Sequence, residues 1–170
     1  MPIPLPIETE RLLVRPFVPD ADSAAMVDVY CDPEVMRFVA GGALADVDAV
    51  KRTLETYSEA QQRRGFSSWA VVERATRRVI GDVGFGVFEP TGDIELGYTL
   101  ARDYWGLGYA TEVAAASLEA GLTHLAVPRI IALVDAANEA SLRVPARIGM
   151  TRIETIEAYE RPHVLFAALR

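Results

Sequence analysis

Residues 98–112 read Tyr-Thr-Leu-Ala-Arg-Asp-Tyr-Trp-Gly-Leu-Gly-Tyr-Ala-Thr-Glu, and the segments on either side of them decide the fold. Before this stretch, apolar and polar residues alternate from Ile94 to Leu100, which is the period of a half-buried strand. After it, apolar residues recur at steps of three, four and seven as far as Leu125, which is the period of a helix with one apolar face. The sequence therefore predicts a strand, a glycine loop and a helix, in that order.

Two glycines in the loop, Gly106 and Gly108, let the backbone turn tightly and approach a ligand closely. The helix that follows has no Ser, Asp or Asn at its start to accept hydrogen bonds from its first N–H groups. These N–H groups carry partial positive charge, so a pyrophosphate is a suitable ligand there. The alternative is a glycine turn that serves only close packing of the strand and the helix, and a short glycine motif alone does not decide between the two.

The composition indicates one globular domain over residues 1–170. Apolar residues make up 51% of the chain and charged residues 24%, which is too much hydrophobic material for a disordered protein. The net charge of −7 argues against binding of nucleic acid or an anionic membrane and favours a cationic substrate. Cys31 is the only cysteine, which excludes an internal disulfide and indicates a reducing compartment. Because no apolar stretch approaches membrane-spanning length, we expect a soluble, cytoplasmic protein.

The rest of the chain predicts one strand and then helices before residue 68, and mostly strands after it. Asp20, Asp32 and Asp46 are expected to begin helical segments over residues 20–30, 34–38 and 46–65. A further helix begins after Asn138, and Pro145 is expected to kink or tighten it. Strands are predicted at residues 11–15, 69–73, 79–88, 94–100, 129–134, 151–159 and 163–169.

The strands over residues 69–100 are predicted to form an antiparallel meander. The strand at residues 129–134 follows a helical crossover, as a buried parallel strand requires. The fold class is therefore α/β (α+β), a mixed and mostly antiparallel central sheet flanked by helices.

These motifs, in this order, resemble the GNAT superfamily of acyl-CoA-dependent N-acetyltransferases over nearly the whole chain. The resemblance rests on residues 105–110, WGLGYA, after one strand and on residues 138–141, NEAS, after the next. Residues 8–16, ETERLLVRP, residues 32–36, DPEVM, and residues 104–106, YWG, are similar to the ribosomal-protein-alanine (RimJ/RimL-type) branch. Several separated motifs in the right order are more specific than one glycine loop.

The resemblance implies a binding site for acetyl-CoA. Trp105 stands where the superfamily's loop usually has Gln or Arg, and it removes a side-chain donor there. Asn138 would bond the pantetheine arm while also capping its helix, and the two roles are compatible. The pyrophosphate would lie on the N–H groups of Gly106, Leu107, Gly108, Tyr109 and Ala110, and the pantetheine amides on the strand edge at Tyr98, Thr99 and Leu100.

Proton transfer has two candidate residues. Glu95 resembles the strand glutamate that some GNAT enzymes use as a base towards the amine, although a solvent-facing strand residue is the alternative. The superfamily's usual tyrosine, seven residues after the asparagine, is replaced here by Pro145. The departing thiolate must then be protonated by Ser141 or by water, or leave unassisted.

The prediction is an enzyme that transfers an acetyl group from acetyl-CoA to a primary amine, a protein or peptide N-terminus, by direct attack in a ternary complex. An acetyltransferase of a small amine, antibiotic or amino-acid analogue is the first alternative, and a non-catalytic acyl-CoA-binding module is the second. His124 and His163 stand at no metal-ligand spacing, so no metal is expected. The oligomeric state is left open, with a homodimer among the options.

Overall fold

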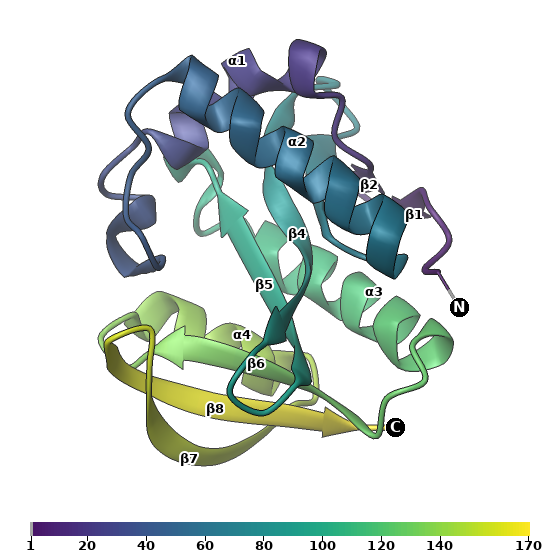
Figure 1. Ribbon diagram of the computed structural model, residues 1–170, viewed down its shortest axis with the longest axis vertical. Coiled ribbons are helices and arrows are strands. Elements are labelled where there is room, and N and C mark those ends of the chain that lie inside the picture. Colours follow the sequence, from purple (N-terminus) through teal and green to yellow (C-terminus); the bar gives the residue numbers. More distant parts are fainter. Residues whose placement is uncertain (1) are drawn as a thin grey trace.

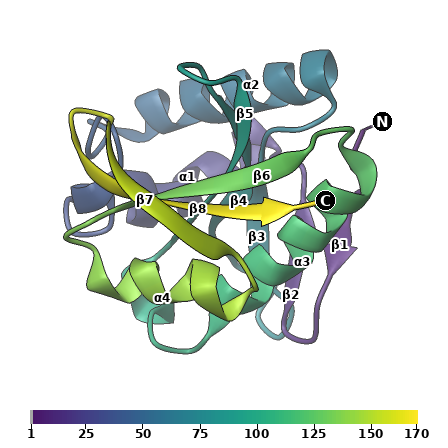
Figure 2. The same ribbon diagram turned by 90° about the horizontal axis from the view of Figure 1, so that it is seen from below.

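One mixed sheet carries all the strands in the structure, a computed structural model that describes residues 2–170. Its spatial order is β1-β2-β3-β4-β5-β6-β8-β7, and every neighbouring pair is antiparallel except β5 and β6 (Figures 1 and 2). The predicted fold class is confirmed. The strands are β1 Ile7–Glu8, β2 Leu12–Arg15, β3 Ser68–Glu73, β4 Val79–Phe88, β5 Asp93–Leu100, β6 Arg129–Asp135, β7 Thr151–Ala158 and β8 Arg161–Leu169.

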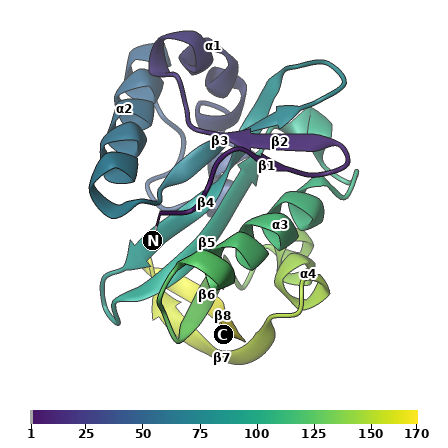
Figure 3. The same ribbon diagram turned by 90° about the vertical axis from the view of Figure 1, so that its right-hand side faces the viewer.

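Helices cover both faces of this sheet, with α1 and α2 on one face and α3 and α4 on the other (Figure 3). Helix α3 packs closely on the strands because Gly121 has no side chain: a Cβ there would lie 2.6 Å from the ring of Phe85. Among residues 2–170, none of the helices combines the length and the apolar character needed to cross a membrane. The helices are α1 Pro19–Tyr30, α2 Val47–Arg64, α3 Tyr109–His124 and α4 Glu139–Arg147, with 3-10 turns η1 Met36–Phe38 and η2 Arg102–Tyr104.

The predicted meander of β3, β4 and β5 is confirmed. In an antiparallel pair, residues that lie directly opposite each other project to the same face of the sheet. Three such pairs of β4 and β5 project to the face that α1 and α2 cover, and glycine fills half of the six positions. These pairs are Asp82 with Thr99, Gly84 with Gly97, and Gly86 with Glu95.

The two parallel strands separate soon after they begin to pair. β5 and β6 are in register only at Ile94–Ile130 and Glu95–Ile131, and residues 96–100 of β5 have no partner on the β6 side (Figure 1). Helix α3 makes the crossover between them, as the sequence predicts. The splayed strands leave the β5 edge around Tyr98 unpaired.

The N-terminal segment differs from the prediction in two details. Helix α1 begins at Pro19, and Asp20, the predicted cap, is instead an exposed residue whose carboxylate pairs with Lys51. The carboxylate that serves this helix end is Asp22, which accepts a hydrogen bond from the Val18 N–H. The first predicted strand is β2, which begins at Leu12, and the short strand β1 before it was not predicted.

Helix α4 follows the prediction at both ends. The side chain of Asn138 accepts a hydrogen bond from the Ser141 N–H and so caps the helix. Pro145 lies inside α4, and near the end the Ile148 N–H is shared between the carbonyls of Val144 and Pro145. The last turn is therefore tightened, as expected for a helix that contains a proline.

Candidate active site

The glycine loop ends in a helix start without a side-chain cap. Gly108 is the residue before α3, and both it and Gly106 have left-handed backbones, with φ of 80° and 76°. A residue with a Cβ would be strained at either position. Because Gly108 offers no side chain, no cap accepts a hydrogen bond from the first N–H groups of α3. The predicted anion site therefore has the expected backbone form.

The Trp105 side chain makes a hydrogen bond within the chain. Its indole N–H donates a hydrogen bond to the Leu100 carbonyl, 2.8 Å away, at the end of β5. The side chain is otherwise half exposed, at 49% of its accessible surface. Trp105 thus ties the loop to the strand edge.

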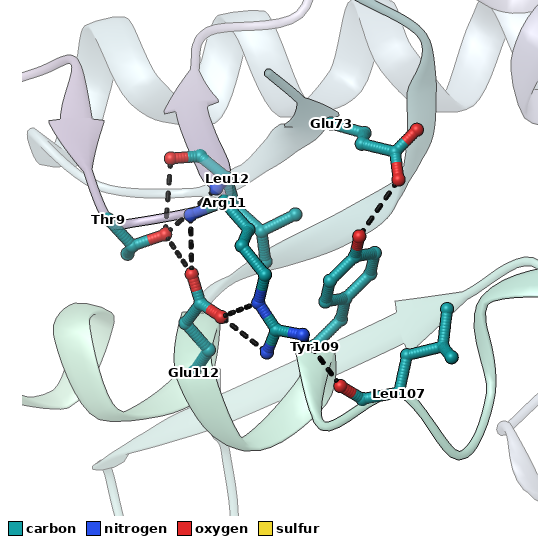
Figure 4. A network of polar contacts seen from close by, with 7 residues as sticks. All are labelled: Thr9, Arg11, Leu12, Glu73, Leu107, Tyr109 and Glu112. Atoms are coloured by element: carbon teal, nitrogen blue, oxygen red, sulfur yellow. Dashed lines mark hydrogen bonds and ion pairs between the residues drawn. The ribbon is translucent and has the colours of Figure 1, made fainter. Parts of the chain in front are cut away.

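A network of polar contacts supports the loop from the side of β2 (Figure 4). The Arg11 guanidinium donates to the Leu107 carbonyl at 2.9 Å and pairs with the Glu112 carboxylate at 2.6 Å. It also lies over the Tyr109 ring, 4.5 Å from its centre, and the Tyr109 hydroxyl donates to Glu73. Neither Arg11 nor Glu112 was among the site residues predicted from the sequence.

The Glu112 carboxylate stays charged in this network. Burial alone would raise its pKa, but hydrogen bonds from the Thr9 hydroxyl and from Arg11 outweigh burial and hold the pKa below its ordinary value. Arg11 thus offsets a negative charge in the first turn of α3, where Glu112 would otherwise repel a bound phosphate.

Glu95 is half-buried on β5 and faces the cavity between the sheet and α1 and α2. Burial raises the pKa of its carboxyl above the ordinary value, while the hydrogen bond from the Tyr159 hydroxyl and the nearby His163 oppose this increase. The Tyr159 O–H lies 2.5 Å from the Glu95 carboxylate. A carboxylate with a raised pKa is a stronger base than an exposed glutamate.

Tyr159 reaches Glu95 from the tip of the β7–β8 hairpin. The two turn residues, Tyr159 and Glu160, both have positive φ, at 51° and 63°. A two-residue turn of this kind normally carries Asn or Gly, because other residues are strained there. The sequence shows a hairpin turn at Tyr159 and Glu160 that lacks Asn and Gly. That feature alone does not identify Tyr159 as the partner of Glu95.

Ser141 lies in the first turn of α4, beside the unpaired edge of β5. Its hydroxyl is 3.0 Å from the Tyr98 hydroxyl, which also lies 3.4 Å from the Ser141 carbonyl. That carbonyl would bond the N–H of residue 145 in a regular helix, and Pro145 has no N–H. Burial raises the pKa of Tyr98 to about 12, so its hydroxyl is protonated at neutral pH.

The structure brings some of the predicted site residues together and keeps others apart. Tyr98 and Ser141 are in contact, and Asn138 lies one turn before Ser141 on the same helix end. Glu95 and Tyr98 project from opposite faces of β5, because side chains alternate along a strand. The two candidate proton carriers, Glu95 and Ser141, therefore approach the strand edge from different sides. Within the described residues 2–170, no cluster of three His, Cys, Asp or Glu side chains could hold a metal ion.

The chain resembles known proteins along almost its whole length. A family model described as "Acetyltransferase (GNAT) domain" matches residues 11–151. The uncharacterized protein YkkB of Bacillus subtilis is 30% identical, and the match covers 93% of this chain and 92% of that protein. The chain belongs to the GNAT acetyltransferase family, and it is an acyltransferase enzyme that acts on nitrogen.

Two further comparisons agree with this family. The crystal structure of a GNAT-family acetyltransferase from Bacillus anthracis superposes with a TM-score of 0.83 at 25% identity, covering 97% of this chain and 98% of that one. An Aspergillus fumigatus protein called FsC-acetyl coenzyme A-N(2)-transacetylase is 28% identical, and the match covers 77% of this chain and 59% of that protein.

Proposed function

We propose that this enzyme transfers the acetyl group of acetyl-CoA to a primary amine by direct attack in a ternary complex. The observation that carries the proposal is the uncapped start of α3, with its two left-handed glycines, beside the unpaired edge of β5. A helix start of this form suits a pyrophosphate, and an unpaired strand edge suits the amide groups of a pantetheine arm.

Acetyl-CoA would supply the activated acyl group. The loop over residues 106–110 would hold the pyrophosphate, and Arg11 would keep the site free of repulsion from Glu112. Residues 98–100 would pair with the pantetheine arm, and Asn138 would bond it from α4. An N–H of this strand edge would also stabilise the negative charge that develops on the carbonyl oxygen.

Glu95 is the proposed base. The amine reaches the site as an ammonium, and Glu95 accepts one of its protons, directly or through a water molecule. The freed nitrogen lone pair forms a bond to the acetyl carbon, the bond between that carbon and sulfur breaks, and the nitrogen loses its second proton to solvent. The products are an amide and a thiolate.

The thiolate takes its proton from Ser141 in this proposal. The Tyr98 hydroxyl, 3.0 Å from the Ser141 hydroxyl, can replace the proton that Ser141 gives up, and Tyr98 then takes a proton from solvent. The hydroxyl pair would thus serve in place of the tyrosine that the superfamily usually has at the position of Pro145.

The acceptor is the finer part of the proposal. The resemblance to the RimJ/RimL-type branch favours a protein or peptide N-terminus. The structure favours the alternative, a small amine, because Glu95 opens into a cavity of about 320 Å³ between the sheet and the α1–α2 side. The Aspergillus relative, named for transfer to an N(2) nitrogen of FsC, is compatible with a small acceptor.

The experiment that tests the proposal is a panel of small amines and short peptides incubated with acetyl-CoA and the purified protein. Release of free coenzyme A and formation of the N-acetyl product, identified by mass spectrometry, are expected in equal amounts. Coenzyme A release without any acetylated product would contradict amine transfer. Binding of acetyl-CoA without turnover on any acceptor would favour the non-catalytic module.

A further inference from the structure

The cavity beside Glu95 has a floor that is largely free of side chains. Gly84, Gly86 and Gly97 supply this part of β4 and β5. A Cβ added at Gly86 or at Gly97 would have no atom within 4 Å, so these two glycines leave open space above the sheet. The walls come from the α1–α2 side: Tyr30, Met36, residues 39–42 and Leu44 of the following loop, Thr53 and Tyr57.

The end of the cavity opposite Glu95 holds a second carboxyl group. Asp82 on β4 is 6% exposed and lines the cavity. The hydroxyls of Thr99, Tyr30 and Ser68 lie around it, close enough to lower its pKa, but burial outweighs them and raises the pKa to about 7. Neither Oδ1 of Asp82 nor the Tyr30 hydroxyl completes a hydrogen bond within residues 2–170.

An unsatisfied buried carboxyl is costly, and native proteins keep few such groups. Asp82 and Tyr30 both line the cavity, and their side chains lie close enough to affect each other's pKa, yet neither the Asp82 Oδ1 nor the Tyr30 hydroxyl has a complete hydrogen bond among the described residues. A ligand that donates hydrogen bonds and reaches this end of the cavity would supply one to Asp82. The residues that line the cavity include Asp82 and Glu95 but no Lys, Arg or His, so the cavity favours a cation.

The two carboxyl groups are set apart along the sheet. Asp82 is four residues before Gly86 on β4, and Gly86 lies opposite Glu95. At about 3.3 Å per residue, the two backbone positions are about 13 Å apart. An acceptor that met both carboxyl groups would therefore have two polar ends joined by a spacer of several atoms.

We propose that the acceptor is a linear diamine, with one amine at Glu95 for acetylation and a second ammonium group held against Asp82. This inference rests on the proposed function and names its substrate class. The apolar spacer of the diamine would lie over Gly97, where the sheet has no side chain. Asp82 acts in binding and takes no part in the chemical step, since it lies at the far end of the cavity.

The test compares α,ω-diamines of increasing length with monoamines of the same length, using the wild-type protein and Asp82→Asn. A hydrogen bond to a charged group corresponds to roughly a ten- to hundredfold change in binding. We expect Asp82→Asn to raise KM for the preferred diamine by about this factor, and to leave KM and kcat for the matched monoamine within about twofold. Asp48→Asn is the control, because it removes one negative charge at an exposed position of α2. It should leave KM unchanged for both the diamine and the monoamine.

A second measurement uses the wild-type protein alone, so it does not depend on whether Asp82→Asn folds. Its kcat/KM for diamines should exceed that for matched monoamines by about tenfold or more and should peak at one spacer length. Equal values for the two series, or a better peptide acceptor, would overturn the diamine assignment while leaving acetyl transfer intact. If no amine is acetylated, the proposed function fails, and diamine stabilisation of the wild-type protein but not of Asp82→Asn would still place a cation at Asp82. If no amine is acetylated and diamines do not stabilise the wild-type protein, both the proposed function and the diamine assignment are refuted.

Discussion

The hydroxyl groups of Tyr98 on β5 and Ser141 on α4 lie 3.0 Å apart on the side of the sheet that α3 and α4 cover. Pro145 has no N–H, so the Ser141 carbonyl lacks the donor that it would have in a regular helix. The Tyr98 hydroxyl lies 3.4 Å from that carbonyl oxygen. Pro145, which stands where the superfamily usually has a tyrosine, thus leaves the Ser141 carbonyl free to accept a hydrogen bond from Tyr98 of β5.

Loss of either hydroxyl should slow the reaction. Ser141→Ala is expected to lower kcat by about ten- to a thousandfold, because the thiolate would then leave unprotonated. Tyr98→Phe should cause a smaller loss, since Ser141 remains. Steady-state kinetics with the best acceptor measures both, and Ser141→Ala at wild-type rate would show that water or unassisted departure suffices.

The hydrogen bond from Tyr159 should set the pH dependence of the reaction. This bond lowers the pKa of Glu95 against the increase caused by burial, so its loss in Tyr159→Phe must raise that pKa further. A base is active only above its pKa, and the acidic limb of kcat/KM should therefore move to higher pH. The dissociation constant of acetyl-CoA should not change. A limb that stays in place, or one that moves to lower pH, would remove Glu95 from the role of base.

Arg11 and Glu112 offer a test of the electrostatics at the start of α3. Arg11→Ala leaves the Glu112 carboxylate uncompensated beside the phosphate site, and the dissociation constant of acetyl-CoA should rise by roughly three- to tenfold. Removing both side chains should restore part of the affinity, because the repelling charge is gone as well. Isothermal titration of the two single variants and the double variant measures this coupling. Strictly additive effects would mean that Arg11 does not act through Glu112.

The buried Asp82 should make stability depend on pH. Its pKa is about 7 when folded and its ordinary value is 3.8, so between these values the folded state holds a proton that the unfolded state has lost. Stability of the wild-type protein should therefore fall as pH rises from about 4 to 7, on the order of a few kcal/mol, and level off above. Asp82→Asn should lack this loss. The measurement is the free energy of unfolding by urea for both proteins at pH 4 to 8, and parallel curves would contradict the assignment.

Much of the fold could be predicted because its signals are local. The strand, the glycine loop and the uncapped helix over residues 94–125 are each defined by period or by glycine, and the structure has them where expected. Asn138 and Asp46 were correct caps, since a cap bonds an N–H three residues away. Asp20 was wrong because Asp22, with Arg15 beside it, serves the same helix end from within the first turn.

The contacts that tune the site could not be predicted, because their partners are far apart in sequence. Tyr159 is 64 residues from Glu95, and Arg11 is 101 residues from Glu112. A single sequence has no local pattern that reports such pairs. The burial of Asp82 was also not predicted. Asp82 lies in β4 among several glycines, which give no hydrophobic pattern from which its burial could be inferred.

Binding of acetyl-CoA at the loop is the claim on which the mechanism depends, and one thermal measurement tests it most directly. Acetyl-CoA should raise the melting temperature of the wild-type protein, because it binds only the folded state. Gly108→Val, which puts a side chain on a left-handed backbone in the loop, should fold and lose this shift. Gly92→Val is the control: Gly92 also has a left-handed backbone, with φ of 74°, but it lies in the β4–β5 turn, outside the loop. This variant should keep the acetyl-CoA-induced shift in melting temperature. An undiminished shift in Gly108→Val would contradict the assignment of the loop.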